Sequence, residues 1–272
     1  DDVTIAFCAV TFAAGVSVQH FSHTYGGDTR ASSTLVDAPA PFDASRSFVL
    51  FSVRQRGSAF DDGNDQFRVV PSGSQQVHVE WGLRSIATGF HWAMAYQVVT
   101  MPAALVQHVS GDGFDRASHT LVLPSAVDPS RSFVVGSHAT LALTTQPVED
   151  LAIDWSLVDA GRRVRASRAN SASSTRSSML LGASIVQLPP EQRVVHAAVS
   201  FNDTSLVETT LPLIDANDTA TAVAIGTGAQ FGGTCSDVAA AGANINAAAF
   251  TVELGTDGSV AVTRAAPPTM LC

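Results

Sequence analysis

Short stretches of this chain alternate apolar and polar residues, which is the pattern of strands that bury one face. In QVHVEW, residues 76–81, the side chains of Val77, Val79 and Trp81 share one face, and the polar residues between them share the other. FTVELG at 250–255 alternates in the same way. Helical periodicity is scarce, so the sequence predicts an all-β fold. Shorter stretches rich in Val and Phe lie at 16–22, 47–53 and 132–136.

Blocks of sequence recur at intervals of about 87 residues, which indicates an internal repeat. DASRSFV at 43–49 returns as DPSRSFV at 128–134, and His20 returns as His108. Two further matches complete the first pair of copies: VHVEWGL at 77–83 with AIDWSLV at 152–158, and QVVTMP at 97–102 with SIVQLP at 184–189.

A third, more divergent copy follows. It holds His196, and TTLPLIDANDTATAVAIG at 209–226 stands where the D-x-S-R-S-F-V block is expected. In this copy FTVELG is matched with VHVEWG, and SVAVTRAAPP at 259–268 is matched with QVVTMP. The stretches that differ between copies, at 57–66, 161–178 and 227–246, are expected to be surface loops, since loops tolerate insertions.

Several short strands per repeat, with turns between them, predict three tandem small β-sandwich-like repeats of about 87 residues. Proline at the joints ends a strand and stiffens the link, which predicts a semi-rigid rod. The expected division is an extra N-terminal strand at 1–15, a first β repeat at 16–102, a second at 103–190 and a divergent third at 191–272.

The N-terminal strand has no repeat before it, although its sequence resembles the segments that close the repeats. Two interpretations remain open. The segment pairs inside the first repeat, as sequential strands usually do, or it completes a sheet in a neighbouring subunit by strand addition. Its candidate assembly residues are Val3, Ile5, Phe7, Val10 and Phe12.

The residues of the doubled D-x-S-R-S-F motif are typical of a turn, and a structural role is favoured over a binding role. Asp43 and Asp128 are expected to cap backbone N–H groups two residues on. Arg46 and Arg131 are then expected to pair with those carboxylates, the alternative being a bound anionic ligand. Two aromatic residues, Phe48 and Phe133, are expected to enter the core.

Charge and cysteine content narrow the class of protein. The formal net charge of −9 over 272 residues argues against a general nucleic-acid binder, which needs a basic face. No apolar run reaches the roughly 20 residues of a membrane-spanning helix. Cys8, Cys235 and Cys272 allow one disulfide with one thiol left over, and the sequence does not choose the pair.

Candidates for bound ions or acidic partners are weak. A loop with Asp61, Asp62, Asn64 and Asp65 offers oxygen ligands for calcium, but its spacing is not that of an EF-hand, and no other cofactor is expected. The sequence favours hydrogen-bonding strand residues over metal ligands for the recurring histidines, which are His20, His108 and His196. The arginines of 161–178 form a basic loop in an otherwise acidic chain.

The succession VQH, D-x-S-R-S-F-V and V-E-W resembles tandem β-repeat proteins of bacterial surfaces and phage tail fibres. The resemblance implies a secreted, cell-surface or virion-surface structural protein that self-associates into a fibre, filament or surface layer. The sequence shows no nucleophile elbow and no Walker loop, and a non-enzymatic role is expected. The alternative is a carbohydrate-binding adhesin or lectin that binds a polysaccharide through exposed aromatic residues such as Trp92 or Tyr96.

Overall fold

The computed structural model divides the chain into two compact units. One comprises Gly15–Val194 and Thr227–Thr234, and the other comprises Asp1–Ala14, Val195–Gly226 and Cys235–Cys272. The regular elements of the described residues are strands and short 3-10 turns, so the predicted all-β fold is confirmed. No helix in these residues has the length and apolar character to cross a membrane. The structure describes residues 15–25, 33–56, 66–81, 91–114, 118–140, 153–168, 178–196, 208–212, 250–254 and 259–264.

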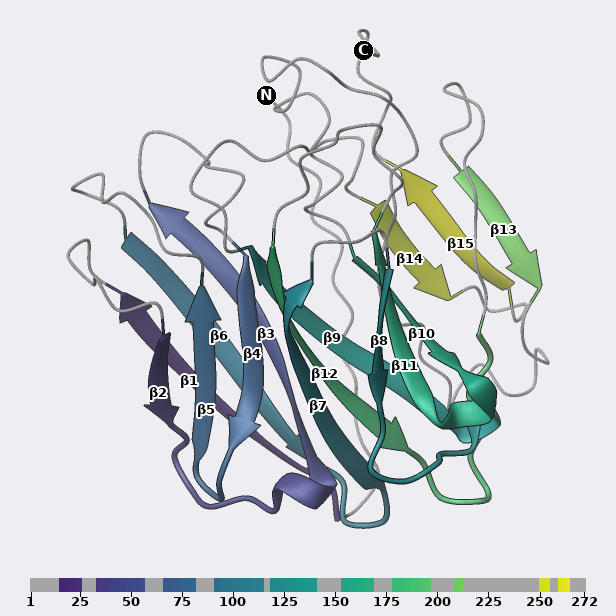
Figure 1. Ribbon diagram of the computed structural model, residues 1–272, viewed down its shortest axis with the longest axis horizontal. Helices are drawn as coiled ribbons and strands as arrows, with labels where there is room; N and C mark the ends of the chain where they lie inside the picture. The colour runs from purple at the N-terminus through teal and green to yellow at the C-terminus, as the bar shows by residue number, and fades with distance from the viewer. Residues whose placement is uncertain are drawn as a thin grey trace, which may run out of the picture. The chain divides into compact units, whose positions relative to one another are not determined.

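The first six strands of the Gly15–Val194 unit form two antiparallel sheets, with strand orders β1-β6-β3 and β2-β5-β4 (Figure 1). We refer to them as the first half. Each sheet places its latest strand in the centre, where it pairs with both neighbours. The strands are β1 (Ser17–Tyr25), β2 (Ser33–Asp37), β3 (Ser47–Arg56), β4 (Phe67–Ser72), β5 (Gln76–Trp81) and β6 (His91–Thr100).

The next six strands repeat this arrangement as the second half, with strand orders β7-β12-β9 and β8-β11-β10. The register repeats as well. Ser17 and Ser47 lie opposite Thr100, while Leu105 and Ser132 lie opposite Gln187. The strands are β7 (Leu105–Phe114), β8 (Ser118–Val122), β9 (Ser132–Thr140), β10 (Ile153–Val158), β11 (Arg163–Arg168) and β12 (Met179–Gln187).

The strand order corrects one match made from sequence. VHVEW lies on β5, whose counterpart is β11, whereas AIDWSLV lies on β10, the counterpart of β4. The segment 161–178, expected to be an inserted loop, therefore begins with a turn and the central strand β11. Its sequence RVRASR alternates, and Val164 and Ala166 are fully buried. The arginines that alternate with these residues make the segment resemble a polar loop in sequence, although one face of the strand is buried.

The other unit contains a sheet of the same order. β13 (Glu208–Pro212), β15 (Ser259–Arg264) and β14 (Phe250–Leu254) are antiparallel and lie in the order β13-β15-β14. This order is that of β2-β5-β4 and also of β1-β6-β3. Because only a short connection separates β14 from β15, as between β4 and β5, we match FTVEL with β4 and SVAVTR with β5. The sequence had matched FTVEL with β5 and SVAVTR with the closing strand β6, and both matches are one strand too late.

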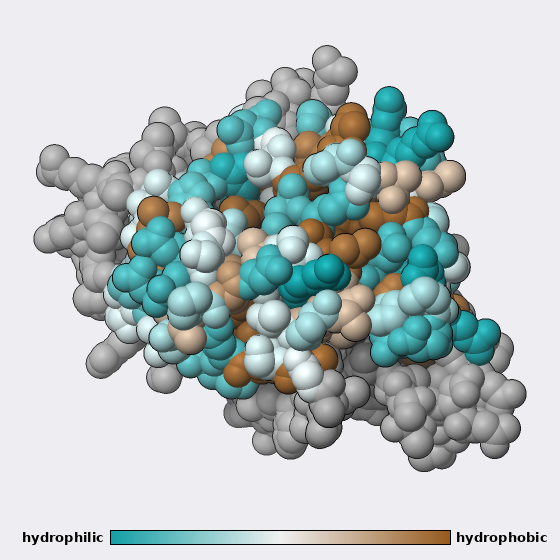
Figure 2. Space-filling view, turned by 90° about the horizontal axis from the view of Figure 1, so that it is seen from below, coloured by the Kyte–Doolittle hydropathy of each residue, from teal (hydrophilic) through white to brown (hydrophobic). Residues whose placement is uncertain are grey.

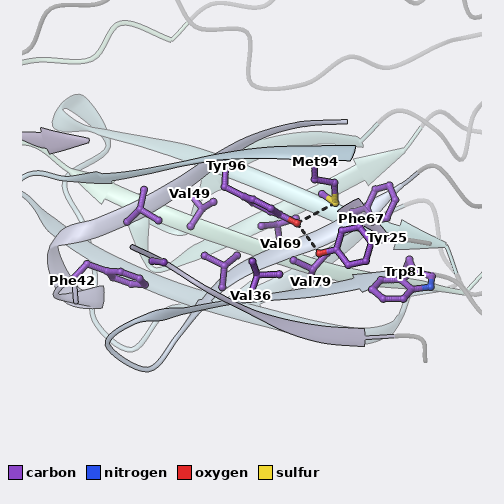
Figure 3. Close-up of a cluster of buried hydrophobic side chains, with 13 residues drawn as sticks. Tyr25, Val36, Phe42, Val49, Phe67, Val69, Val79, Trp81, Met94 and Tyr96 are labelled. Atoms are coloured by element: carbon purple, nitrogen blue, oxygen red, sulfur yellow. Dashed lines mark hydrogen bonds between the residues drawn. The ribbon is translucent and has the colours of Figure 1, made fainter. Parts of the chain in front are cut away.

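The core of the first half lies between its two sheets (Figure 3). Val77 and Val79 of β5 and Met94 and Tyr96 of β6 are fully buried. The hydroxyl of Tyr25 lies 2.8 Å from that of Tyr96, which donates to the sulfur of Met94 at 3.2 Å. Tyr25 is therefore the donor in the first bond, and both phenols are satisfied inside the core. Burial raises the pKa of both Tyr25 and Tyr96.

The core of the second half places its large side chains on different strands. Trp155 takes the place that Val69 has in the first half, and Ala183 takes that of Tyr96. Gly136 replaces Phe51 in the same way, and a Cβ atom there would lie 2.2 Å from the indole nitrogen of Trp155. A large ring on one sheet is thus matched by small residues on the other, as dense packing requires.

We predict that Gly136→Ala lowers the free energy of unfolding by about 1–3 kcal/mol, the usual cost of overpacking, because the indole of Trp155 occupies the space of the new methyl group. The measurement is urea unfolding followed by tryptophan fluorescence. Combining Gly136→Ala with Trp155→Phe should cost less than the sum of the two single changes, because the smaller ring makes room. Strictly additive effects would show that the two residues do not compete for space.

Candidate functional site: the contact between the two halves

Each half begins its β3-type strand with the repeated D-x-S-R-S motif, which forms a 3-10 turn. In η1 (Ala44–Arg46), the carboxylate of Asp43 accepts from the backbone N of Ser45 at 2.9 Å and from its hydroxyl at 2.7 Å. In η2 (Pro129–Arg131), Asp128 accepts the same two bonds from Ser130. The hydrogen bonds from these serines hold the pKa of Asp43 and of Asp128 below the usual range.

The arginine of the motif ties the turn to the joint that leaves the closing strand. Arg46 donates from Nη1 to the carbonyl of Ala104, and its own carbonyl accepts from Met101 N at 2.8 Å. Arg131 donates to the carbonyl of Leu188 at 3.0 Å and to the carboxylate of Asp128 at 3.0 Å. Each guanidinium therefore has a partner within the protein. Figure 2 shows this end of the molecule, where hydrophobic side chains lie in small groups between hydrophilic ones.

The sequence predicted that the two phenylalanines of the motif enter the core. Phe48 is 4% exposed and thus buried, but neither phenylalanine belongs to the two core clusters. Val49 and Val134 point into the cores, so the preceding residue of each strand points the other way. Phe48 and Phe133 contact each other edge to face, with ring centroids 5.8 Å apart. They join the first half to the second.

The two halves lie side by side, with β4 and β3 of the first half facing β9 and β12 of the second (Figure 1). The turn η1 packs against β7 in the same contact. This arrangement corrects the expectation of a rod whose repeats touch only at their joints. The outer face of the β7-β12-β9 sheet, turned away from its own core, is the surface that meets the first half.

Arg68 on β4 is the buried ionic group of this contact. Its side chain is 9% exposed and pairs with Glu80, which lies opposite it on β5. It also donates to the carboxylate of Asp112 on β7 at 2.6 Å and to the carbonyl of Leu181 on β12 at 3.4 Å. One guanidinium thus holds a carboxylate from its own half and two acceptors from the other.

His108 on β7 makes the second polar link. Its Nδ1 lies 2.9 Å from the hydroxyl of Ser184, and its Nε2 lies 2.8 Å from the carbonyl of Ala44 in η1. A carbonyl only accepts, so Nε2 carries the proton in the neutral ring. Burial lowers the pKa of His108, which keeps the imidazole neutral. His20 occupies the same register position in the first half and is exposed.

Two small residues let the strands approach closely. The hydroxyl of Ser137 accepts from the backbone N of Val69 at 3.0 Å and donates to the carbonyl of the same residue at 3.1 Å. It thereby covers the free edge of β4, which would otherwise expose unpaired backbone groups. A Cβ atom on Gly182 would lie 2.7 Å from a methyl group of Val70, so the two strands lie close together here and Val70 would have to shift to admit a larger residue.

The outer face of the β1-β6-β3 sheet is the counterpart of this contact surface in the first half. Its residues Ser52 and Ala95 correspond to Ser137 and Gly182 and are exposed. The two halves therefore meet head to tail: one face of the second half contacts one edge of the first. The equivalent face of the first half is exposed around Ser52 and Ala95, whereas its other end, at Phe48 and Val99, is buried.

The other residues singled out from sequence do not gather into a site. Tyr96 is fully buried in the core and Trp92 packs against it, so neither is a free platform for a sugar ring. His196 is exposed. The part of the chain that the structure describes holds no cluster of three metal-ligating residues. Several candidates lie outside the described residues: the calcium loop at 57–65, the three cysteines, and the assembly residues of 1–14.

The polar residues of the contact were mostly missed from sequence. Arg68, Ser137 and Gly182 lie within apolar strands, and no local pattern distinguishes an outward residue that meets water from one that meets another repeat. His108 was singled out as a hydrogen-bonding strand residue, but its partner in η1 is 64 residues away. Comparison of the chain with protein-family models, curated proteins and solved structures finds no match.

We predict that Arg68→Ala destabilises the Gly15–Val194 unit far more than Asp112→Ala does. Removing Arg68 leaves the carboxylate of Glu80, whose side chain is only 14% exposed, without the guanidinium, and such a loss costs about 3–5 kcal/mol in buried pairs. The side chain of Asp112 is 70% exposed, and losing such a partner costs about 1 kcal/mol or less. Urea unfolding of the two variants measures the difference. Equal effects would show that Arg68 is not the centre of the contact.

We also predict that acid weakens this contact through His108. The folded protein takes up a proton at His108 less readily than the unfolded chain does, so the free energy of unfolding falls as the pH drops below about 6.5. His108→Gln retains a donor for Ala44 and should reduce this loss between about pH 7 and pH 5. His20→Gln, on the exposed counterpart, should not reduce it. Identical pH profiles for wild type and His108→Gln would contradict the assignment.

Proposed function

We propose that the chain is a non-enzymatic extracellular structural protein, a subunit of a fibre, filament or surface layer. Its architecture is three tandem small β-sandwich repeats of about 87 residues. Its place is outside the cell, on a cell surface or on a virion. The partner is a further copy of the same chain.

The observation that carries this proposal is the head-to-tail contact between the two halves. A contact that joins different surfaces of two like units leaves one of each surface free, and such contacts build open assemblies unless a ring closes. In the first half the free surface is the outer face around Ala95, Ser52 and His20. The occupant we assign to it is an edge of the β4 type from a second copy, because that edge already fills the equivalent face of the second half.

The N-terminal strand, residues 1–15, takes part in this assembly. Its large apolar residues Val3, Ile5 and Phe7 alternate with the small residues Thr4 and Ala6, as in a strand that adds to an existing sheet. Strand addition supplies main-chain hydrogen bonds, and the apolar residues of one face supply burial.

Negative-stain micrographs of the full chain should show filaments or sheets. Ala95→Arg places a charge in the middle of the free outer face and should reduce the polymer at least about tenfold, because a charge buried in such a contact lacks a partner. Thr120→Arg, at an exposed position of the edge strand β8, is the control and should leave assembly intact.

Deleting residues 1–12 should also reduce assembly. A chain that stays monomeric at high concentration and binds oligosaccharides on a glycan array would contradict the structural role and support the carbohydrate-binding alternative.

A further inference from the structure

We infer that the outward face of the β8-β11-β10 sheet binds an acidic polysaccharide through the guanidinium groups of Arg163 and Arg165. The inference goes beyond the proposed function. It concerns a different face of the Gly15–Val194 unit, and it holds whether or not the chain forms filaments. The sequence placed these arginines in a basic loop, whereas the structure places them on the central strand of a sheet (Figure 1).

The two arginines stand on the same side of β11. Val164 and Ala166, which alternate with them, are fully buried in the core of the second half, so Arg163 and Arg165 point outward. Both arginines are exposed. Their Cα atoms are about 7 Å apart, since a strand rises about 3.4 Å per residue. One extended polymer can therefore contact both guanidinium groups.

The edge strand β8 adds a hydroxyl and an apolar group to this face. Thr120 lies opposite Arg165, and Val122 lies opposite Arg163. Thr120 is exposed, and Val122 is 68% exposed. These groups suit a sugar ring, which presents hydroxyls and an apolar ring face. The guanidinium groups suit the carboxylate or sulfate that an acidic sugar carries in addition.

The acids near these arginines leave both guanidinium groups accessible to a ligand. Asp159 pairs with Arg163 at 3.3 Å, but both side chains are about half exposed, and an anion can replace such a weak surface pair. Asp154 lies diagonally across from Arg165 on the same face. Burial raises the pKa of Asp154, and the charge of Arg165 opposes this rise. Among the described residues, no carboxylate lies within ion-pair distance of Arg165.

The first half shows that the scaffold does not require these positive charges. At the positions of Arg163 and Arg165, its central strand β5 has Gln76 and His78. Arg68, on the same outward face, is neutralised by its buried pair with Glu80. The exposed basic face is therefore particular to the second half, and it lies on a chain whose formal net charge is −9.

Two observations favour a polysaccharide over other anionic polymers. β11 pairs with both of its neighbours, so its backbone offers no edge to an added peptide strand, and recognition depends on side chains. Nucleic acids and anionic membranes are held by many basic residues, whereas this chain has 15 basic residues against 24 acidic ones. A small basic face with a neighbouring hydroxyl fits a polymer that carries both acidic groups and neutral hydroxyls.

Titration calorimetry of the full chain with polygalacturonate, a carboxylated polysaccharide, tests the inference. Polygalacturonate should bind, and uncharged dextran should not. Arg165→Gln should weaken the binding about tenfold, because it removes a charge-assisted hydrogen bond, and added salt should also weaken it. Leu35→Glu is the matched control. It changes the net charge by the same amount at the first-half position that corresponds to Thr120, and it should bind as the wild type does.

Urea unfolding separates lost binding from lost folding, since Arg165→Gln alters an exposed side chain and should unfold at the wild-type urea concentration. Stronger binding of heparin, a sulfated polysaccharide, with the same loss in Arg165→Gln would support the inference and identify the acidic group as sulfate. Three results would overturn it: no binding of either polysaccharide, an equal loss in Leu35→Glu, or tighter binding of single-stranded DNA or of phosphatidylserine vesicles. None of them bears on the filament, which Ala95→Arg tests separately.

Discussion

The Gly15–Val194 unit depends on one constraint: the central strands β6 and β12 hold their sheets together. Each pairs with two neighbours that are far apart in sequence, so β1 and β3, or β7 and β9, form a sheet only when the closing strand lies between them. The same strand supplies core residues, such as Tyr96 in β6 and Ile185 in β12. Because this strand comes last in each repeat, the sheet is completed by a long-range pairing.

Unlike β6, β12 is buried along both of its faces. Its inward residues Leu181 and Ile185 fill the core, while Gly182 and Ser184 face the first half. Both sides of this strand are nearly fully buried, which explains the apolar sequence MLLGASIVQ. The exposed counterpart of Gly182 is Ala95, so this scaffold position carries a small residue in both halves.

The parts of the structure that follow from local chemistry could be read from the sequence, and the parts set by tertiary contacts could not. The alternation of apolar and polar residues predicted β5. The turn at Asp43 was predicted because its hydrogen bond joins residues only two apart. Phe48 was expected to enter the core of its own repeat, but at this position the strand is covered on both faces, by the core on one side and by the contact on the other. Matching Trp81 with Trp155 failed for a different reason: a large side chain can lie on a different strand of an equivalent core where a small residue, such as Gly136, makes room for it.

The polarity of the contact bears on how repeats of this kind associate. A purely apolar contact would let like units slide past each other, whereas Arg68, His108 and Ser137 each require a partner at a fixed register. Ser137 also occupies the free edge of β4, which would otherwise pair with any exposed strand. The edge is thus available only to a face that presents a hydroxyl in the correct place, and Ser52 presents one on the open face of the first half. That face therefore keeps the polar group needed for a specific contact, and Gln97 stands where Ser184 supports the histidine.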